Sequence, residues 1–150
     1  MKKVLTLLLM LGLSFAAFAQ MVDPVKFSSK LEMLKDGEAQ IVFTGKIDDG
    51  WHVYSTNLGN DGPISATFNA VKMDGAEPVG KLTPKGHEIS QFDNMFGMKL
   101  RFFEKSVTFV QKIKFTKPEY SINCYLEYGA CNDETCMPPT EVPFTGKGKS

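Results

Sequence analysis

The stretch YSINCYLEY, residues 120–128, alternates apolar and polar side chains along its whole length. Its apolar positions are Ile122, Cys124, Leu126 and Tyr128, and they alternate with Ser121, Asn123, Tyr125 and Glu127. A period of two residues is typical of a strand that buries one face and exposes the other. We therefore predict a half-buried strand here, with Cys124 inside as a small apolar side chain.

Two further stretches carry the same alternation, AQIVFTGKID at residues 39–48 and VTFVQKIKF at residues 107–115. Turn-forming pairs separate such stretches, among them Asp49-Gly50, Asp74-Gly75 and Lys117-Pro118. No long segment keeps the period of about 3.6 residues that marks a helix. Many short strands with regular turns predict a single all-β domain, either an antiparallel β-sandwich or a barrel.

The first residues, MKKVLTLLLMLGLSFAAFAQ, have the three parts of a secretory signal peptide. Two lysines precede an apolar run, and the small-x-small motif Ala17-Phe18-Ala19 follows it. We expect residues 1–19 to be cleaved near Ala19 on export to a bacterial periplasm. One domain over residues 20–145 and a polar tail over residues 146–150 would remain. The apolar run is short for a bilayer span, so we expect no membrane insertion after cleavage.

Charge limits the possible partners of the exported chain. Removal of Lys2 and Lys3 with the signal peptide leaves 15 basic residues against 17 acidic ones. A net charge of about −2 provides no electrostatic attraction for a polyanion. The composition therefore argues against nucleic acid and anionic membranes as partners.

A second motif, YGACNDETCMPP at residues 128–139, contains Cys131 and Cys136 with the spacer NDET between them. In an exported protein such a pair can form a disulfide that persists. The loop-entropy model gives about 2 kcal/mol for a ring of roughly six residues, which is weak stabilisation for a domain of this size. Spacing alone leaves two interpretations open, an exchangeable redox disulfide and a structural staple.

Metal binding is a third interpretation of the same cysteines. Zinc sites usually combine two pairs of ligands, whereas His52 and His87 lie far apart in the sequence. A Cu(I) site could use Cys136 with methionines such as Met95 or Met137. The methionines show no repeated spacing, however, and methionine is also an ordinary core residue. We therefore expect no metal and no other cofactor.

Three segments carry a family resemblance when they are taken together. They are DGWHVYS at residues 49–55, FDNMFG at residues 92–97 and YGACNDETCMPPTEVPF at residues 128–144. The third is fairly specific, because it joins a cysteine pair, a Pro-Pro pair and a closing strand. In this order and spacing, the segments resemble the N-terminal periplasmic domain of the DsbD thiol:disulfide interchange family. The similarity covers most of the exported chain.

The resemblance implies an immunoglobulin-like β-sandwich with a redox-active Cys131–Cys136 pair at one end. It implies that Cys136 forms mixed disulfides with partner proteins and that Cys131 resolves them. Met95 then falls where the family has an aromatic cap residue, with Phe96 beside it. Three further residues fall on positions that line the site: Asp93, His52 and Tyr54.

The same resemblance implies an activity and a set of partners. Members pass reducing equivalents to thioredoxin-like periplasmic proteins, including those of cytochrome c biogenesis. They are recharged through a membrane-embedded segment and a thioredoxin-like domain, neither of which occurs in this sequence. We therefore expect a separate membrane protein to supply the electrons.

This sequence departs from the family pattern at three positions of the expected site. The spacer NDET is one residue shorter than in the best-known members. Met95 replaces an aromatic cap residue with a flexible thioether, and His52 replaces a tyrosine with a group that titrates near neutral pH. The local geometry and the shielding of the disulfide are therefore expected to differ from those of other members.

The acidic spacer bears on reactivity, because the thiolate is the attacking form of cysteine. Asp133 and Glu134 lie between the two cysteines, and nearby carboxylates favour the neutral thiol. We expect a slow free nucleophile that becomes active on a docked partner. The alternative function is a non-catalytic envelope adaptor with a structural disulfide, which would have a reduction potential below about −300 mV.

Overall fold

The computed structural model describes residues 23–150, so the expected signal peptide lies outside the described residues. Within this range the chain forms strands and no helix, and therefore no helix that could cross a membrane. The strands are β1 (Val25–Met33), β2 (Glu38–Ile47), β3 (His52–Tyr54), β4 (Thr67–Asp74), β5 (Ala76–Lys85), β6 (Ile89–Asp93), β7 (Met98–Phe103), β8 (Ser106–Phe115), β9 (Glu119–Tyr128), β10 (Ala130–Cys131) and β11 (Thr140–Lys149).

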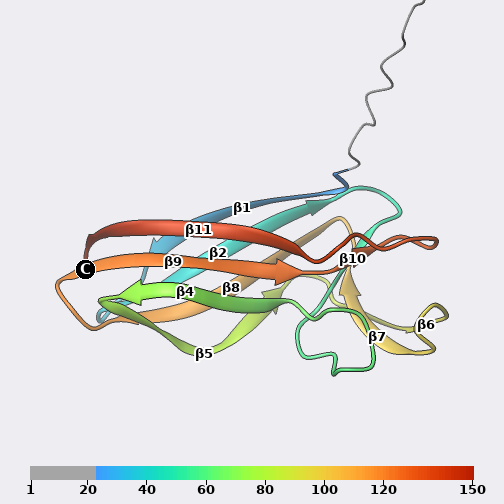
Figure 1. Ribbon diagram of the computed structural model, residues 1–150, viewed down its shortest axis with the longest axis horizontal. Coiled ribbons are helices and arrows are strands. Elements are labelled where there is room, and N and C mark those ends of the chain that lie inside the picture. Colours follow the sequence, from blue (N-terminus) through green and yellow to red (C-terminus); the bar gives the residue numbers. More distant parts are fainter. Residues whose placement is uncertain (1–22) are drawn as a thin grey trace, which may run out of the picture.

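Two antiparallel sheets form the body of the molecule. One has the strand order β1-β2-β8-β5 and the other β11-β9-β4. Figure 1 shows them as two layers of long strands running along the longest axis. Their inner faces contribute to one buried cluster, which includes Phe43 and Phe109 from the first sheet and Leu126 and Phe144 from the second. The all-β prediction is confirmed, and the architecture is the sandwich rather than the barrel.

The alternating stretches of the sequence are strands of this sandwich. Residues 120–128 lie in β9, where Ile122 and Leu126 are buried and Glu127 points away from the core. The stretches at residues 39–48 and 107–115 correspond to β2 and β8, which pair with each other in the middle of their sheet. Alternation predicted these strands because each one buries one face against the opposite sheet.

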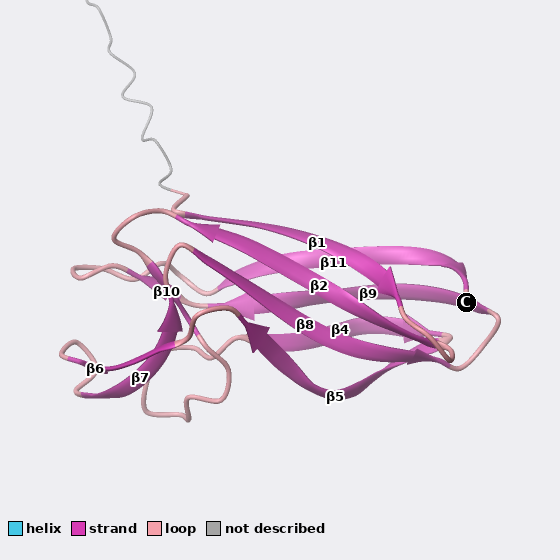
Figure 2. Ribbon diagram, turned by 180° about the vertical axis from the view of Figure 1, so that it is seen from behind, coloured by secondary structure: helices cyan, strands magenta, loops and turns pink. Residues whose placement is uncertain are grey.

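A third, smaller sheet with the order β10-β3-β7-β6 extends one end of the sandwich. Its strands β6, β7 and β10 gather at that end in both views (Figures 1 and 2), while the chain ends at the opposite end. The sheet brings together three segments that are distant in sequence, namely residues 52–54, 89–103 and 130–131. All the residues of the expected redox site lie in or beside this sheet.

The segment at residues 146–150, expected to be a polar tail, lies largely in β11, which continues to Lys149. Gly146 and Gly148 pair with Ile122 and Tyr120 of β9. Backbone N–H and C=O groups can form this ladder whatever the side chains are. The glycines also leave room for aromatic rings, since an added Cβ on Gly146 would lie 3.0 Å from the ring of Phe144. β11 therefore extends to Lys149, and the expected boundary at residue 145 falls inside it.

Candidate redox site

Cys131 and Cys136 form a disulfide bond at the end of the sandwich that carries the third sheet. Asn132 shapes the loop between them. Its side-chain oxygen accepts the backbone N–H groups of Glu134 at 2.9 Å and Thr135 at 2.7 Å. Such a side-chain cap is typical of asparagine in tight turns, and it sets the two cysteines opposite each other as an antiparallel bridge.

The two cysteines differ in their exposure to solvent. Cys131 is 2% exposed and packs in a small apolar cluster with Tyr54, Leu100 and Phe102. Cys136 is exposed on the outer side of the loop. A thiolate from another molecule must reach the sulfur that it attacks. Cys136 is therefore the accessible sulfur, and Cys131 is the one that would leave into a buried environment.

The turn between β6 and β7 covers the disulfide from one side. Asp93 holds this turn, because its Oδ1 accepts the backbone N–H groups of Met95 at 2.8 Å and Phe96 at 3.1 Å. The Sδ of Met95 then lies 3.7 Å from the Sγ of Cys136. This is a van der Waals contact, since a disulfide-bonded sulfur has no proton to donate. Met95 remains 49% exposed, so the cover is partial.

Truncation of this cover should make the disulfide easier to reach. In a Met95→Ala variant we expect reduction by a small thiol such as glutathione to accelerate roughly twofold to tenfold, because access limits exchange. The rate can be followed by mass spectrometry of trapped free thiols. Met33→Ala is a matched control, since Met33 is 54% exposed on β1, outside the third sheet. Equal rates in Met95→Ala and the wild type would contradict a shielding role for Met95.

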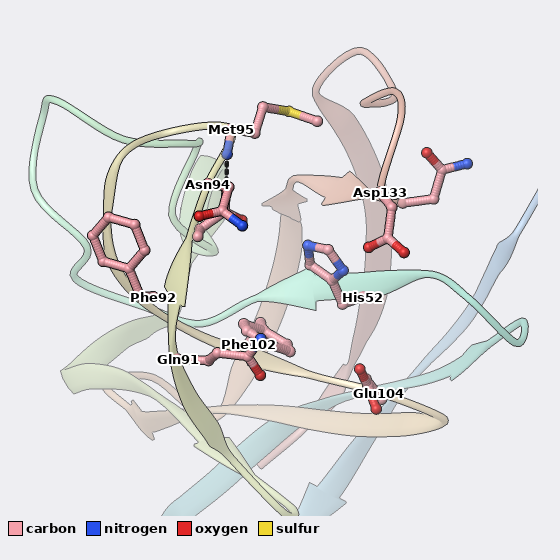
Figure 3. A pocket seen from close by; sticks show the side chains of 10 residues that line it. His52, Gln91, Phe92, Asn94, Met95, Phe102, Glu104 and Asp133 are labelled. Atoms are coloured by element: carbon pink, nitrogen blue, oxygen red, sulfur yellow. Dashed lines mark hydrogen bonds between the residues drawn. The ribbon is translucent and has the colours of Figure 1, made fainter.

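A chain of polar groups lies beneath the Met95 turn. The Nε2 of His52 lies 3.0 Å from the hydroxyl of Tyr54, and that hydroxyl donates a long hydrogen bond of 3.5 Å to Oδ2 of Asp93. His52 also packs against the ring of Phe102, with ring centroids 4.7 Å apart. Figure 3 shows the imidazole between the turn that carries Met95 and the side chain of Asp133. His52, Asp93 and Asp133 line an open cavity of about 280 Å³.

The charges around His52 are all negative. Burial lowers the pKa of His52 from its usual value of 6.5, and the nearby carboxylates of Asp93, Glu104 and Asp133 partly oppose this effect. Burial and the proximity of Asp93 raise the pKa of the Tyr54 phenol, so Tyr54 keeps its proton at neutral pH. Because Tyr54 donates its hydrogen bond to Asp93, it does not donate one to His52. The neutral imidazole of His52 then carries its proton on Nε2, which faces the Tyr54 hydroxyl.

A second cavity of about 210 Å³ lies beside the disulfide. Both cysteines line it, together with apolar side chains that include Ile64, Phe96 and Met137. An apolar pocket beside an exposed sulfur can bury side chains of a docked protein. The disulfide thus borders an apolar cavity, and the loop residues Asn132 and Asp133 line the polar, acidic one.

The structure brings the seven residues expected at the site into one region. These are Cys131, Cys136, Met95, Phe96, Asp93, His52 and Tyr54. Sequence reasoning missed Phe102 and Ile64, which pack beside the disulfide. The alternation of Leu100 and Phe102 after the Met95 turn was an available signal for a buried strand face. Nothing in the local sequence indicated that Ile64, in a loop, would reach the site.

The third cysteine does not belong to this site. Cys124 is free, 1% exposed and buried in the core of the sandwich, and burial raises the pKa of its thiol to about 12. The prediction of a buried apolar role for Cys124 is confirmed. Within residues 23–150 no group of three or more His, Cys, Asp or Glu side chains is arranged to hold a metal ion.

Together the fold and the site define an immunoglobulin-like β-sandwich with an asymmetrically exposed disulfide at one end. Comparison with known proteins shows which family has this fold and site. The chain belongs to the family described as thiol:disulfide interchange protein DsbD, N-terminal, whose model matches residues 19–146. The predicted family and the immunoglobulin-like fold are therefore confirmed. No match was found among curated protein sequences.

The solved structures that this chain resembles have low sequence identity to it. The N-terminal periplasmic domain of ScsB from Proteus mirabilis is 16% identical, with a TM-score of 0.55 and 83% of this chain covered. This chain spans 46% of that structure's chain. The reduced N-terminal domain of DsbD from Neisseria meningitidis is 18% identical, with a TM-score of 0.47, and the match covers 83% of this chain and 86% of that one.

Proposed function

We propose that this protein is a periplasmic carrier of reducing equivalents, which exchanges the Cys131–Cys136 disulfide with thioredoxin-like proteins. The observation that carries the proposal is the difference in exposure between the two sulfurs. Cys136 is exposed, whereas Cys131 is 2% exposed. Membership of the thiol:disulfide interchange family supports the same chemistry.

The exchange has two steps that need no cofactor. The reduced protein attacks the disulfide of a partner with the Cys136 thiolate, so that a Cys136–partner disulfide forms and the partner's other sulfur leaves as a thiolate. Cys131 then attacks the Sγ of Cys136, which restores the Cys131–Cys136 bond and releases the partner's second sulfur. Two electrons pass to the partner, whose two sulfurs each take up one proton. The reverse sequence recharges this protein from a donor dithiol.

The surroundings of Cys136 favour a protein rather than a small thiol as the exchange partner. Met95 touches the exposed sulfur and partly covers it, so it hinders attack from that side. A docking protein can displace this side chain and fill the apolar cavity lined by Ile64, Phe96 and Met137. Burial of apolar area of this kind offsets the cost of moving the cap. The electrons would then be given up mainly to a docked partner.

The location and the electron source follow from the same proposal. The N-terminal segment has the pattern of a secretory signal peptide, and disulfide exchange of this kind operates in the oxidising periplasm. A separate membrane protein would supply the electrons that keep Cys131 and Cys136 reduced. Partners in cytochrome c biogenesis belong to the thioredoxin-like class that we propose.

Trapping of the intermediate tests this function. In a Cys131→Ser variant the resolving sulfur is absent, so a Cys136–partner disulfide should accumulate when oxidised thioredoxin-like proteins are added. A non-reducing gel followed by mass spectrometry identifies the captured protein. The Cys131→Ser/Cys136→Ser double variant is the control and should capture nothing. Failure of both single cysteine variants to form a mixed disulfide would contradict the proposal and favour an adaptor with a structural disulfide.

A further inference from the structure

His52 lies directly opposite Cys131 in the structure. The antiparallel register of β10 and β3 pairs Cys131 with His52 and Ala130 with Val53. Directly opposed residues of an antiparallel pair point to the same face, with Cβ atoms about 5 Å apart. The side chains of His52 and Cys131 therefore start from neighbouring positions on one face of the sheet, although the two residues are distant in the sequence.

The hydrogen bonds of His52 and Tyr54 indicate which nitrogen of His52 carries the proton. Tyr54 keeps its proton and donates a hydrogen bond to Asp93, so its hydroxyl oxygen can accept the Nε2–H of His52 at 3.0 Å. This arrangement selects the neutral tautomer in which Nδ1 carries the lone pair. Nδ1 is then the nitrogen that is left to take up a proton.

Cys131 needs such a proton acceptor in the second step of exchange. It attacks as a thiolate, yet it is 2% exposed and packs in an apolar cluster with Tyr54, Leu100 and Phe102. Bulk water has little access to its proton, and an apolar environment disfavours the unpaired thiolate. A neutral base on the opposed strand would remove this obstacle.

We propose that His52 accepts the proton of the Cys131 thiol during the resolving step, with Tyr54 and Asp93 as positioning residues. The S–H bond of Cys131 breaks and its proton moves to the imidazole. The thiolate forms the bond to Cys136, the Cys136–partner bond breaks, and the partner sulfur leaves with the electron pair and takes up a proton. When a donor dithiol reduces the protein again, the Cys131–Cys136 bond breaks and the His52 imidazolium returns a proton to the Cys131 thiolate. This inference rests on the proposed exchange function.

The charged groups around His52 suit this role. Tyr54 faces it from the same strand, Asp93 from the end of β6, Glu104 from the turn between β7 and β8, and Asp133 from the loop between the cysteines. The three carboxylates stabilise the imidazolium once it forms. Burial nevertheless keeps the pKa of His52 below its usual value of 6.5. The imidazole is therefore neutral near pH 7 and can accept a proton.

A partner-free pH-jump experiment tests the role of His52. Cys136 of the reduced protein is first capped in acid with an aromatic disulfide such as dithiobis(nitrobenzoate), because protonated Cys131 does not resolve the adduct there. A jump to the test pH then starts the attack by Cys131, which releases the coloured aromatic thiolate. The release rate reports the resolving step alone. It is measured in the wild type and in the His52→Gln and His52→Tyr variants.

Near neutral pH the wild type should resolve the adduct about a hundredfold faster than either variant, which is the lower end of the range for a positioned base. The wild-type rate should fall as acid protonates His52, through a pKa below 6.5. The difference between proteins should shrink in alkali, where the Cys131 thiolate forms without a base. His87→Gln, which changes the exposed second histidine, should match the wild type at every pH.

Identical pH profiles in the wild type and in both folded His52 variants would overturn the inference. A thermal unfolding midpoint for each variant establishes that it is folded, and His52→Tyr provides a second side chain if His52→Gln does not fold. The assay contains no partner protein, so its outcome is separate from that of the trapping experiment. Failure to trap a partner would count against the proposed function but would leave the pH profile of the resolving step unchanged.

Discussion

A Cys136→Ser variant is expected to lose all transfer of electrons to thioredoxin-like partners. The exposed Cys136 sulfur is the one that a partner can reach, and a serine hydroxyl cannot form a disulfide. The remaining Cys131 is 2% exposed and lies inside the Tyr54–Phe102 cluster, so it cannot take over as the attacking group. The measurement is the rate at which chemically reduced protein reduces an oxidised thioredoxin-like domain, followed by the thiol content of that domain.

Cys124→Ala is the matched control for this loss. Cys124 is a buried core residue whose raised pKa of about 12 keeps its thiol neutral, and it lies in β9 outside the third sheet. Its removal should leave the transfer rate at the wild-type level, with a small loss of stability from the lost sulfur. Transfer that persists in Cys136→Ser would contradict the assignment of Cys136 as the attacking sulfur. Transfer that disappears in Cys124→Ala would show that a third cysteine takes part.

A Phe109→Ala variant should lose about 3–5 kcal/mol of unfolding free energy, which is the usual cost of removing a buried aromatic side chain. Phe109 is fully buried in β8 and packs against the rings of Phe27 and Phe103. It also pairs with Phe43 of β2 in the middle of the sheet. A close-packed interior between two sheets cannot collapse fully onto the space left behind. Urea denaturation followed by tryptophan fluorescence measures the change.

The same chemical change on the surface provides the comparison. Phe92 is 59% exposed in β6, so Phe92→Ala should change the unfolding free energy by less than about 0.5 kcal/mol. A similar loss in both variants would mean that the two sheets do not share a tightly packed core. A loss at Phe109 alone would agree with a close-packed core between the two sheets.

Much of the fold was predictable from local sequence patterns. The alternation in residues 39–48, 107–115 and 120–128 predicted β2, β8 and β9, because burial of one strand face leaves a period of two residues in the sequence. The pattern failed at residues 146–150. A polar, glycine-containing segment gives no burial signal, yet its backbone completes the ladder with β9.

The candidate site was predictable to a smaller extent. The cysteine pair, its polar spacer and the flanking prolines are contiguous, so the motif by itself indicated an exchange disulfide or a staple. The family resemblance added His52, Tyr54 and the Met95 turn as residues of the same site. Phe102 and Ile64 were missed, because their positions beside the disulfide depend on how β7 and a loop pack against β10.

The sequence by itself determined the strands β2, β8 and β9, the presence of two closely spaced cysteines and the export pattern, since each of these is a property of neighbouring residues. The tertiary structure decided that Cys131 is buried and Cys136 exposed, that Met95 touches the exposed sulfur, and that His52 is opposed to the buried one. These contacts join segments separated by whole strands. They depend on sheet order and register, which pairing across the entire fold sets and no local pattern encodes.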